Sequence, residues 1–149
     1  MTACIDTMQD ETAAIFGVGI SNTADRALTI TGVELLHTYD VAPVTVALAS
    51  EGRDGVGWGS ALVSTIEDDE HMSQAWSARR DAIGAHIEPG GREYLLLITN
   101  TAADPTVLAG IRGVKVSFDG APWPRSTENR NTYGFGPDAQ CDPDEVEEW

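Results

Sequence analysis

The chain has few basic residues. Nine Lys and Arg stand against 24 Asp and Glu in 149 residues, which gives a net charge of −15. A surface this acidic repels phosphate backbones, so the composition argues against nucleic acid as a partner. It disfavours anionic membrane surfaces for the same reason. Acidity keeps a protein soluble and collects cations, but it does not identify a partner.

The chain also lacks a long apolar segment. No run approaches the ~20 apolar residues that a membrane-spanning helix needs. Met1-Thr2-Ala3 leads directly into polar sequence, without the apolar stretch of a signal peptide. Such a start is typical of a chain trimmed after a leader or anchor. We therefore expect no direct membrane insertion by this segment, and a tether upstream remains open.

Cysteine is scarce, with only Cys4 and Cys141, one near each end. The first and last strands of a β-sandwich can lie close together, which favours a disulfide between them. That bond would stabilise the chain by roughly 4–5 kcal/mol in the loop-entropy model and would require an oxidising compartment. Two unrelated thiols are the alternative. A third reading makes Cys4 the acylated residue of a lipoprotein cleavage box, Thr2-Ala3-Cys4. The disulfide and lipoprotein readings place the domain outside the cytoplasm.

The sequence lacks motifs that are typical of a particular catalytic reaction. His37, His71 and His86 are scattered, and no nucleophile elbow, metalloprotease or P-loop pattern surrounds them. The run Gly-Trp-Gly-Ser at 57–60 does not match G-x-S-x-G. We therefore expect a protein that is not an enzyme.

Two related segments rich in Thr, Ala and Val are present, one at 16–35 and one beginning at Ile98 as ITNTAADPTVLAGIRGVKV. In each, apolar residues alternate and then slip by one position, at Gly32 and at Gly113 respectively. A strand that slips must bulge or bend, and glycine tolerates the positive φ that a bulge favours. Bent strands form corners, where one strand leaves a sheet for the other. Two matched corners predict a β-sandwich, with chance similarity as the alternative.

The remaining alternation completes an all-β pattern. Pro89 and Gly90 predict a type II turn at 87–91, and the apolar run 94–98 is typical of a central strand covered on both faces. About seven short strands separated by turns favour an immunoglobulin-like antiparallel β-sandwich. The predicted strands are 14–22, 27–37, 44–49, a short piece near 56–63, 93–100, 108–118 and 132–135.

Segment 66–83 does not show strand alternation. Acidic residues crowd its start, and Arg79 and Arg80 stand near its end, the order that a helix dipole prefers. We expect a short helix or helical loop across one end of the sandwich. The residues that share one side of it are Met72, Trp76 and Ile83.

The start of this segment carries the candidate metal ligands, Glu67, Asp68, Asp69, Glu70 and His71. Calcium favours clustered oxygen ligands, and the pair formed by His71 and the next Met is a weak indication of copper. The spacing does not match an EF-hand loop, and consecutive carboxylates on a helix point in different directions. A solvated acidic first turn is the simpler interpretation, in which case the chain needs no cofactor.

Tryptophan supplies the candidate partner-binding residues. Exposed aromatic rings on sandwich loops bind glycans or proteins, and Trp58 and Trp123 both lie in predicted loops. Trp123 stands between two prolines and is the stronger candidate. The alternative is that each ring plugs an end of the core.

The run GVGISNTADRALTITGVEL, followed later by IEPGGREYLLL, resembles extracytoplasmic sandwich domains of actinobacterial cell-envelope proteins. The resemblance implies an immunoglobulin-like fold and an extracytoplasmic location, secreted or anchored to the envelope. It transfers no functional residue. We expect a single domain at 1–136, an acidic tail at 137–149, and a non-catalytic interaction or structural module whose partner is an unknown protein or glycan. A cation-dependent binding domain, with calcium or copper at Glu67–His71, is the alternative.

Overall fold

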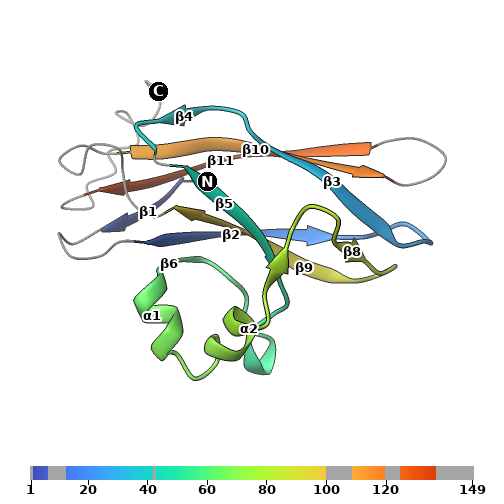
Figure 1. The fold of residues 1–149 in the computed structure, drawn as a ribbon, viewed down its shortest axis with the longest axis horizontal. Helices are drawn as coiled ribbons and strands as arrows, with labels where there is room; N and C mark the ends of the chain where they lie inside the picture. The colour runs from blue at the N-terminus through green and yellow to red at the C-terminus, as the bar shows by residue number, and fades with distance from the viewer. Residues whose placement is uncertain (1, 7–12, 42, 100–108, 120–124, 137–149) are drawn as a thin grey trace.

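The computed structural model describes residues 2–6, 13–41, 43–99, 109–119 and 125–136, arranged as two β-sheets with short helices (Figure 1). The first sheet has the order β1-β11-β10-β3-β8, with β4 also beside β10. Its strands are β1 (Thr2–Asp6), β3 (Leu28–Leu35), β4 (Thr38–Tyr39), β8 (His86–Ile87), β10 (Ala109–Asp119) and β11 (Arg125–Gly136).

The second sheet has the order β6-β2-β9-β5-β7. All described pairings are antiparallel except that of β1 with β11, which is parallel. The predicted all-β class is therefore confirmed. The strands of the second sheet are β2 (Ala14–Ser21), β5 (Val44–Ala49), β6 (Ser60–Leu62), β7 (Arg80–Asp81) and β9 (Arg92–Thr99).

The two sheets share one hydrophobic core. The ring of Phe16 in β2 lies 5.2 Å from that of Tyr133 and 5.8 Å from that of Phe135, both in β11, measured between centroids. Ile30, Leu48 and other apolar side chains fill the same cluster with almost no exposed surface. Burying this area between two layers is the main stabilising term, and the arrangement fits a β-sandwich.

The two related segments have the same role in the fold. The loop at 22–27 carries the chain from β2 in the second sheet to β3 in the first, and β9 and β10 repeat this passage. The strands also pair in a matched way, β2 with β9 and β3 with β10. The repeated pattern therefore marks the same change of sheet twice, from β2 to β3 and from β9 to β10.

The breaks in alternation at Gly32 and Gly113 are β-bulges, but the prediction that these strands turn a corner from one sheet to the other is wrong. The register of β10 against β11 shifts at Gly113, whose φ is +84°, and that of β10 against β3 shifts beside Gly32. Neither β3 nor β10 changes sheet. The bulge absorbs the slip, so Ile111 before Gly113 and Val114 after it both face the core.

Segment 66–83 forms two short helices instead of one. They are α1 (Val63–Asp68) and α2 (Ser73–Ser77), and neither is long enough to span a membrane. Asp69 separates them because its Oδ1 accepts hydrogen bonds from the backbone N–H groups of His71 and Met72. The predicted apolar side also fails at Ile83, which is 51% exposed.

The position of this insert also differs from the prediction. Instead of lying across one end of the sandwich, it packs against the outer face of the second sheet, below the two layers in Figure 1. Trp58, Met72 and Trp76 contact the outward-facing side chains of the sheet there, and this second cluster explains why β9 is apolar on both faces. The sheet residues in the cluster are Ile15, Ala47, Ala49, Tyr94 and Leu96.

Candidate functional site

One side of the sandwich has two strand edges without neighbours among the described residues. On β11, the parallel partner β1 pairs only with residues 132–136, which leaves 125–130 uncovered. On β2, β6 pairs only with residues 14–16, and Gly17 N–H donates to the carbonyl of Gly59. Beyond that bond, residues 18–21 of β2 have no second strand among the described residues. We call residues 125–130 of β11 and 18–21 of β2 the open edge.

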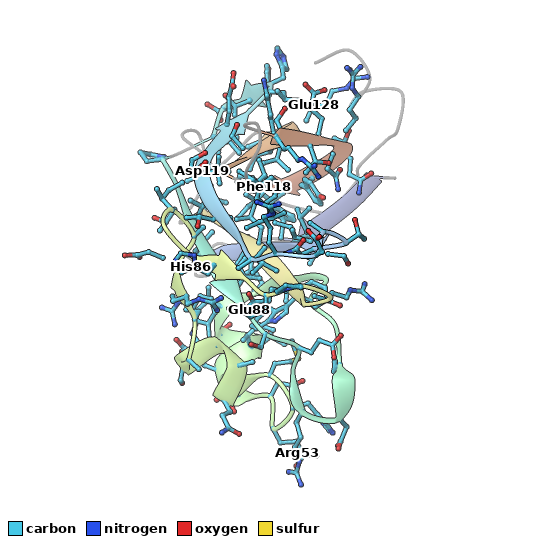
Figure 2. All side chains as sticks on the ribbon, turned by 90° about the vertical axis from the view of Figure 1, so that its right-hand side faces the viewer. Arg53, His86, Glu88, Phe118, Asp119 and Glu128 are labelled. Carbon is cyan, nitrogen blue, oxygen red and sulfur yellow. The ribbon has the colours of Figure 1, made fainter. Side chains whose placement is uncertain are left out.

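A cleft of about 600 Å³ lies between the two halves of the open edge. Val18 and Ile20 form one wall, and Val116 and Phe118 lie at the back, each no more than 7% exposed. Figure 2 looks at this end of the molecule, with Phe118 near the middle and Glu128 towards the top. The apolar back of the cleft belongs to the core, and its mouth is polar.

The inner face of β11 changes character where β1 ends. Tyr133 and Phe135, beside β1, are buried aromatic residues of the core. In the uncovered half, residues paired with buried residues of β10 lie on the same inner face, because directly opposite residues share a face. These inner-face residues are polar. Asn129 lies opposite Val114, Thr127 opposite Val116 and Arg125 opposite Phe118.

Charge at the cleft is unlike that of the rest of the chain. Two arginines and one glutamate line it, in a protein with a net charge of −15. Arg130 pairs with Glu128 at 3.3 Å across exposed surface, a contact of small energetic value. Arg125 makes no ion pair with another described residue, and its side chain is exposed. The open edge therefore offers a guanidinium to an incoming carboxylate.

Tyr133 and two asparagines close the inner end of the polar stretch. Burial raises the pKa of the Tyr133 phenol, and hydrogen bonds to Asn131 and Asn129 offset part of that rise. The side chain of Asn129 also accepts from the N–H of Asn131 at 2.7 Å. These contacts fix the bulged part of β11, so the polar wall of the cleft is held in one shape.

Asn22 lies at the end of the cleft formed by β2 and the loop that follows it. Its side chain is only 2% exposed. Its Nδ2 donates to the carbonyls of Arg26 and Ile87, both at 2.8 Å, and its Oδ1 accepts from the N–H of Ala24 at 2.9 Å. Its backbone also pairs with both glycines of the turn at 87–91, where Gly90 has the predicted positive φ of +73°. The rim of the cleft is therefore tied to the 86–91 segment.

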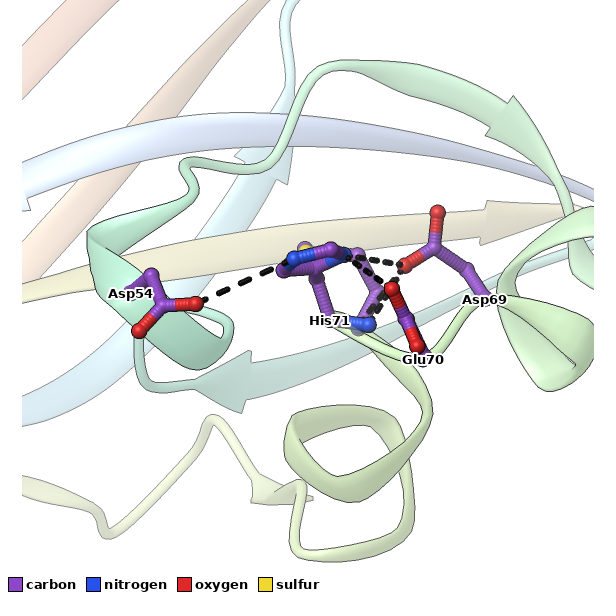
Figure 3. Close-up of polar contacts among 5 residues, drawn as sticks. Asp54, Asp69, Glu70 and His71 are labelled. Carbon is purple, nitrogen blue, oxygen red and sulfur yellow. Dashed lines mark hydrogen bonds and ion pairs between the residues drawn. The ribbon is translucent and has the colours of Figure 1, made fainter.

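The predicted metal ligands are only partly brought together (Figure 3). The ring of His71 lies 3.9 Å from carboxylate oxygens of Asp69 and Glu70, and 3.8 Å from one of Asp54, which was not predicted. Glu67 and Asp68 belong to the last turn of α1 and make no such contact with His71. No three His, Cys, Asp or Glu side chains in the described ranges are arranged to hold a metal ion.

Trp58 does not have the exposure that its predicted binding role requires. It is 6% exposed, its Nε1 donates to the carbonyl of Ser50 at 2.8 Å, and its ring lies 6.4 Å from that of Trp76. The ring therefore fills the cluster under the insert, because burying that area is worth more than leaving it in water. Trp123 lies outside the described residues.

The predicted disulfide cannot be placed. Cys141 lies outside the described residues, and only the backbone of Cys4 is described, within β1. The tail at 137–149 lies outside them as well.

Sequence reasoning missed the open edge. Residues 125–131, RSTENRN, are polar throughout, so the alternation that marks a half-buried strand is absent. The one available signal was their position between a loop and the alternating Tyr133 and Phe135. That position permits a longer strand, whereas the prediction began only at Thr132.

The fold and cleft define an all-β, two-sheet protein in which the described strands leave one side partly uncovered. No protein-family model matches the chain, and no curated protein or solved structure matches it significantly. Function must therefore be argued from the geometry itself.

Proposed function

We propose that this chain is an immunoglobulin-like, non-catalytic interaction module of a bacterial cell-envelope protein, and that it binds its partner at the open edge. The observation that carries the proposal is the cleft between two uncovered strands. A strand edge exposes unpaired N–H and C=O groups, and an adjacent cleft gives a partner's side chains a place to bind. The described site holds no nucleophile next to a general base, which favours binding over catalysis.

The strand order supports the immunoglobulin-like part of the proposal. Constant-type immunoglobulin domains arrange their strands as ABED in one sheet and CFG in the other. Taking β2, β9 and β5 as B, E and D reproduces the first order. Taking β3, β10 and β11 as C, F and G reproduces the second, and β6 then occupies the position of strand A. Two features depart from this order. β6 follows β5 in the chain, within the connection at 50–91 that also builds the helices, and β1 pairs in parallel with β11.

The envelope location rests on the resemblance to actinobacterial extracytoplasmic domains. It is tested by fractionating cells that express the natural gene and detecting the protein with an antibody. We expect it in the envelope or the medium. Recovery in the cytosol alone contradicts the location.

The binding role is tested in the same cells with a photoreactive amino acid at Thr127, which faces the cleft and is exposed. The matched control carries it at Ser77, an exposed residue at the end of α2. We expect a discrete crosslinked species from position 127 and none from position 77. Equal labelling from both positions, or none from either, contradicts a binding role for the open edge.

The second candidate function is cation-dependent binding at His71, and the observation that favours it is the set of three carboxylates around the ring. A cation would have to draw these side chains closer than they stand. Calcium or copper at about 100 times its dissociation constant should then add ~2.7 kcal/mol of stability. Melting curves with each ion and with EDTA test this, with Glu70→Gln as the variant that loses the rise. Flat curves contradict it.

A further inference from the structure

The open edge has the geometry of a site for one additional β-strand. The outer edge of β11 already accepts a parallel strand, β1, from Thr2 opposite Thr132 to Asp6 opposite Gly136. Residues 125–130 continue the same edge in the same sheet, so a strand placed there would lie in line with β1. Strand addition of this kind takes its affinity from backbone hydrogen bonds and its specificity from alternate side chains.

The chemistry of the edge indicates which strand it would take. Every second side chain of an added strand points into the cleft, towards Thr127 and Asn129 on the inner face of β11. Arg125 stands at the N-terminal end of this stretch and makes no ion pair with another described residue. A carboxylate in the incoming strand would pair with the positive charge of Arg125, and a basic side chain would be repelled there.

On the basis of the proposed function, we infer that the open edge binds an extended acidic peptide of a partner protein as a parallel strand. The peptide runs in the same direction as β11, with Asp or Glu near its N-terminal end beside Arg125. Its C-terminal end lies beside Arg130, at the end of the uncovered stretch. Small polar or apolar side chains alternate along it and fill the cleft in front of Phe118. Residues 125–130 of β11 thereby have a neighbouring strand on both sides, β10 and the peptide.

Two devices keep the edge from pairing indiscriminately. Natural edge strands are protected by charges and bulges. Here Glu128 and Arg130 lie within the uncovered stretch, and the bulge opposite Gly113 ends it. A strand without a suitably placed Asp or Glu leaves the guanidinium charge of Arg125 without a partner in the complex. The charges that protect the edge and the guanidinium of Arg125 therefore act together, because specificity depends on what the site rejects as well as on what it accepts.

The test is selection from a displayed library of random eight-residue peptides against the immobilised chain, followed by titration of synthetic copies of the enriched peptides. We expect enrichment of Asp or Glu near the N-terminal end. In NMR titrations the amides of 125–130 and 18–21 should shift. Arg125→Glu should weaken binding at least about tenfold, a change of ~1.4 kcal/mol.

Arg53→Glu is the matched control, because it makes the same change of charge on the exposed turn at 53–55, at the bottom of Figure 2. It should leave binding unchanged. Repeating the selection on Arg125→Glu should replace the acidic preference with Lys or Arg, which a merely destabilised variant would not do. Melting curves confirm that each variant is folded.

The inference is overturned if no peptide is enriched above the blank support, or if the enriched peptides show no acidic preference. It is also overturned if they bind Arg125→Glu as well as the parent, or shift amides elsewhere. Crosslinking at Thr127 in cells together with any of these results would leave the proposed function standing and remove only the acidic strand. Absence of that crosslink would remove the proposed function itself.

Discussion

Asn22 shows how one buried polar side chain holds two distant segments together. It joins the loop after β2 to the carbonyl of Ile87 through contacts that no apolar residue can make. Asn22→Ala leaves buried backbone groups without partners, which costs about 1–3 kcal/mol. We expect the melting temperature to fall by roughly 3–10 °C, as measured by circular dichroism.

The control for this change is Thr23→Ala, on the adjacent exposed residue. Exposed substitutions of this kind usually change stability by less than about 0.5 kcal/mol. Equal melting temperatures for Asn22→Ala and Thr23→Ala would contradict the role of Asn22 at the rim of the cleft.

Tyr133 gives the fold a dependence on alkaline pH. Because burial raises the pKa of its phenol in the folded state, the fold prefers the neutral form. That contribution is complete below the unfolded pKa of about 10, and it is lost as pH rises through the raised pKa of the folded protein. We predict that the urea midpoint falls less steeply between pH 9 and 12 in Tyr133→Phe than in the parent. Parallel curves would rule this out.

At the scale of elements, the insert depends on a close approach to the second sheet. A Cβ on Gly17 would lie 2.5 Å from the Cβ of Trp58 and 2.8 Å from its carbonyl oxygen. Gly17→Ala must therefore push the loop around Trp58 away from β2, at a cost of about 1–3 kcal/mol. We expect a lower melting temperature and a red shift in tryptophan emission.

Gly59→Ala is the matched control, because a Cβ there meets nothing within 4 Å. A Gly17→Ala variant as stable as Gly59→Ala, with unchanged emission, would show that the insert does not pack on the sheet as described.

The sequence predicts the long strands well and the short ones poorly. Alternation places β2, β3, β5, β9 and β10 within a few residues of their observed bounds, because half-burial imposes period two. It misses β1 and the two-residue strands β4, β7 and β8, whose pairing is decided by residues far along the chain. It also merges α1 and α2, because the charge order that favours a helix hides the competing hydrogen bonds of Asp69.

At the scale of the whole molecule, the candidate site could not be predicted at all. Its two walls come from β2 and β11, which lie near opposite ends of the chain and meet only because the sheets pack. Trp58 and the acidic run at 67–70, which stand out in the sequence, lie outside this cleft. Trp58 fills a cluster that the second sheet could not otherwise cover, and the acids at 67–70 lie at the end of α1 and in the turn before α2. Polar residues 125–130 become informative only once the described pairing of β1 is seen to cover 132–136 of β11 and not 125–130.

The central claim is that no other described segment covers the outer edge of β11 over residues 125–130. Amide hydrogen exchange followed by NMR tests this most directly, because exchange reports which N–H groups are hydrogen-bonded. We predict that every second amide across 125–130 exchanges rapidly while consecutive amides across 132–135 are all protected by β10 and β1. Uniform protection across 125–130 would mean that another segment already occupies the edge, and it would contradict the account.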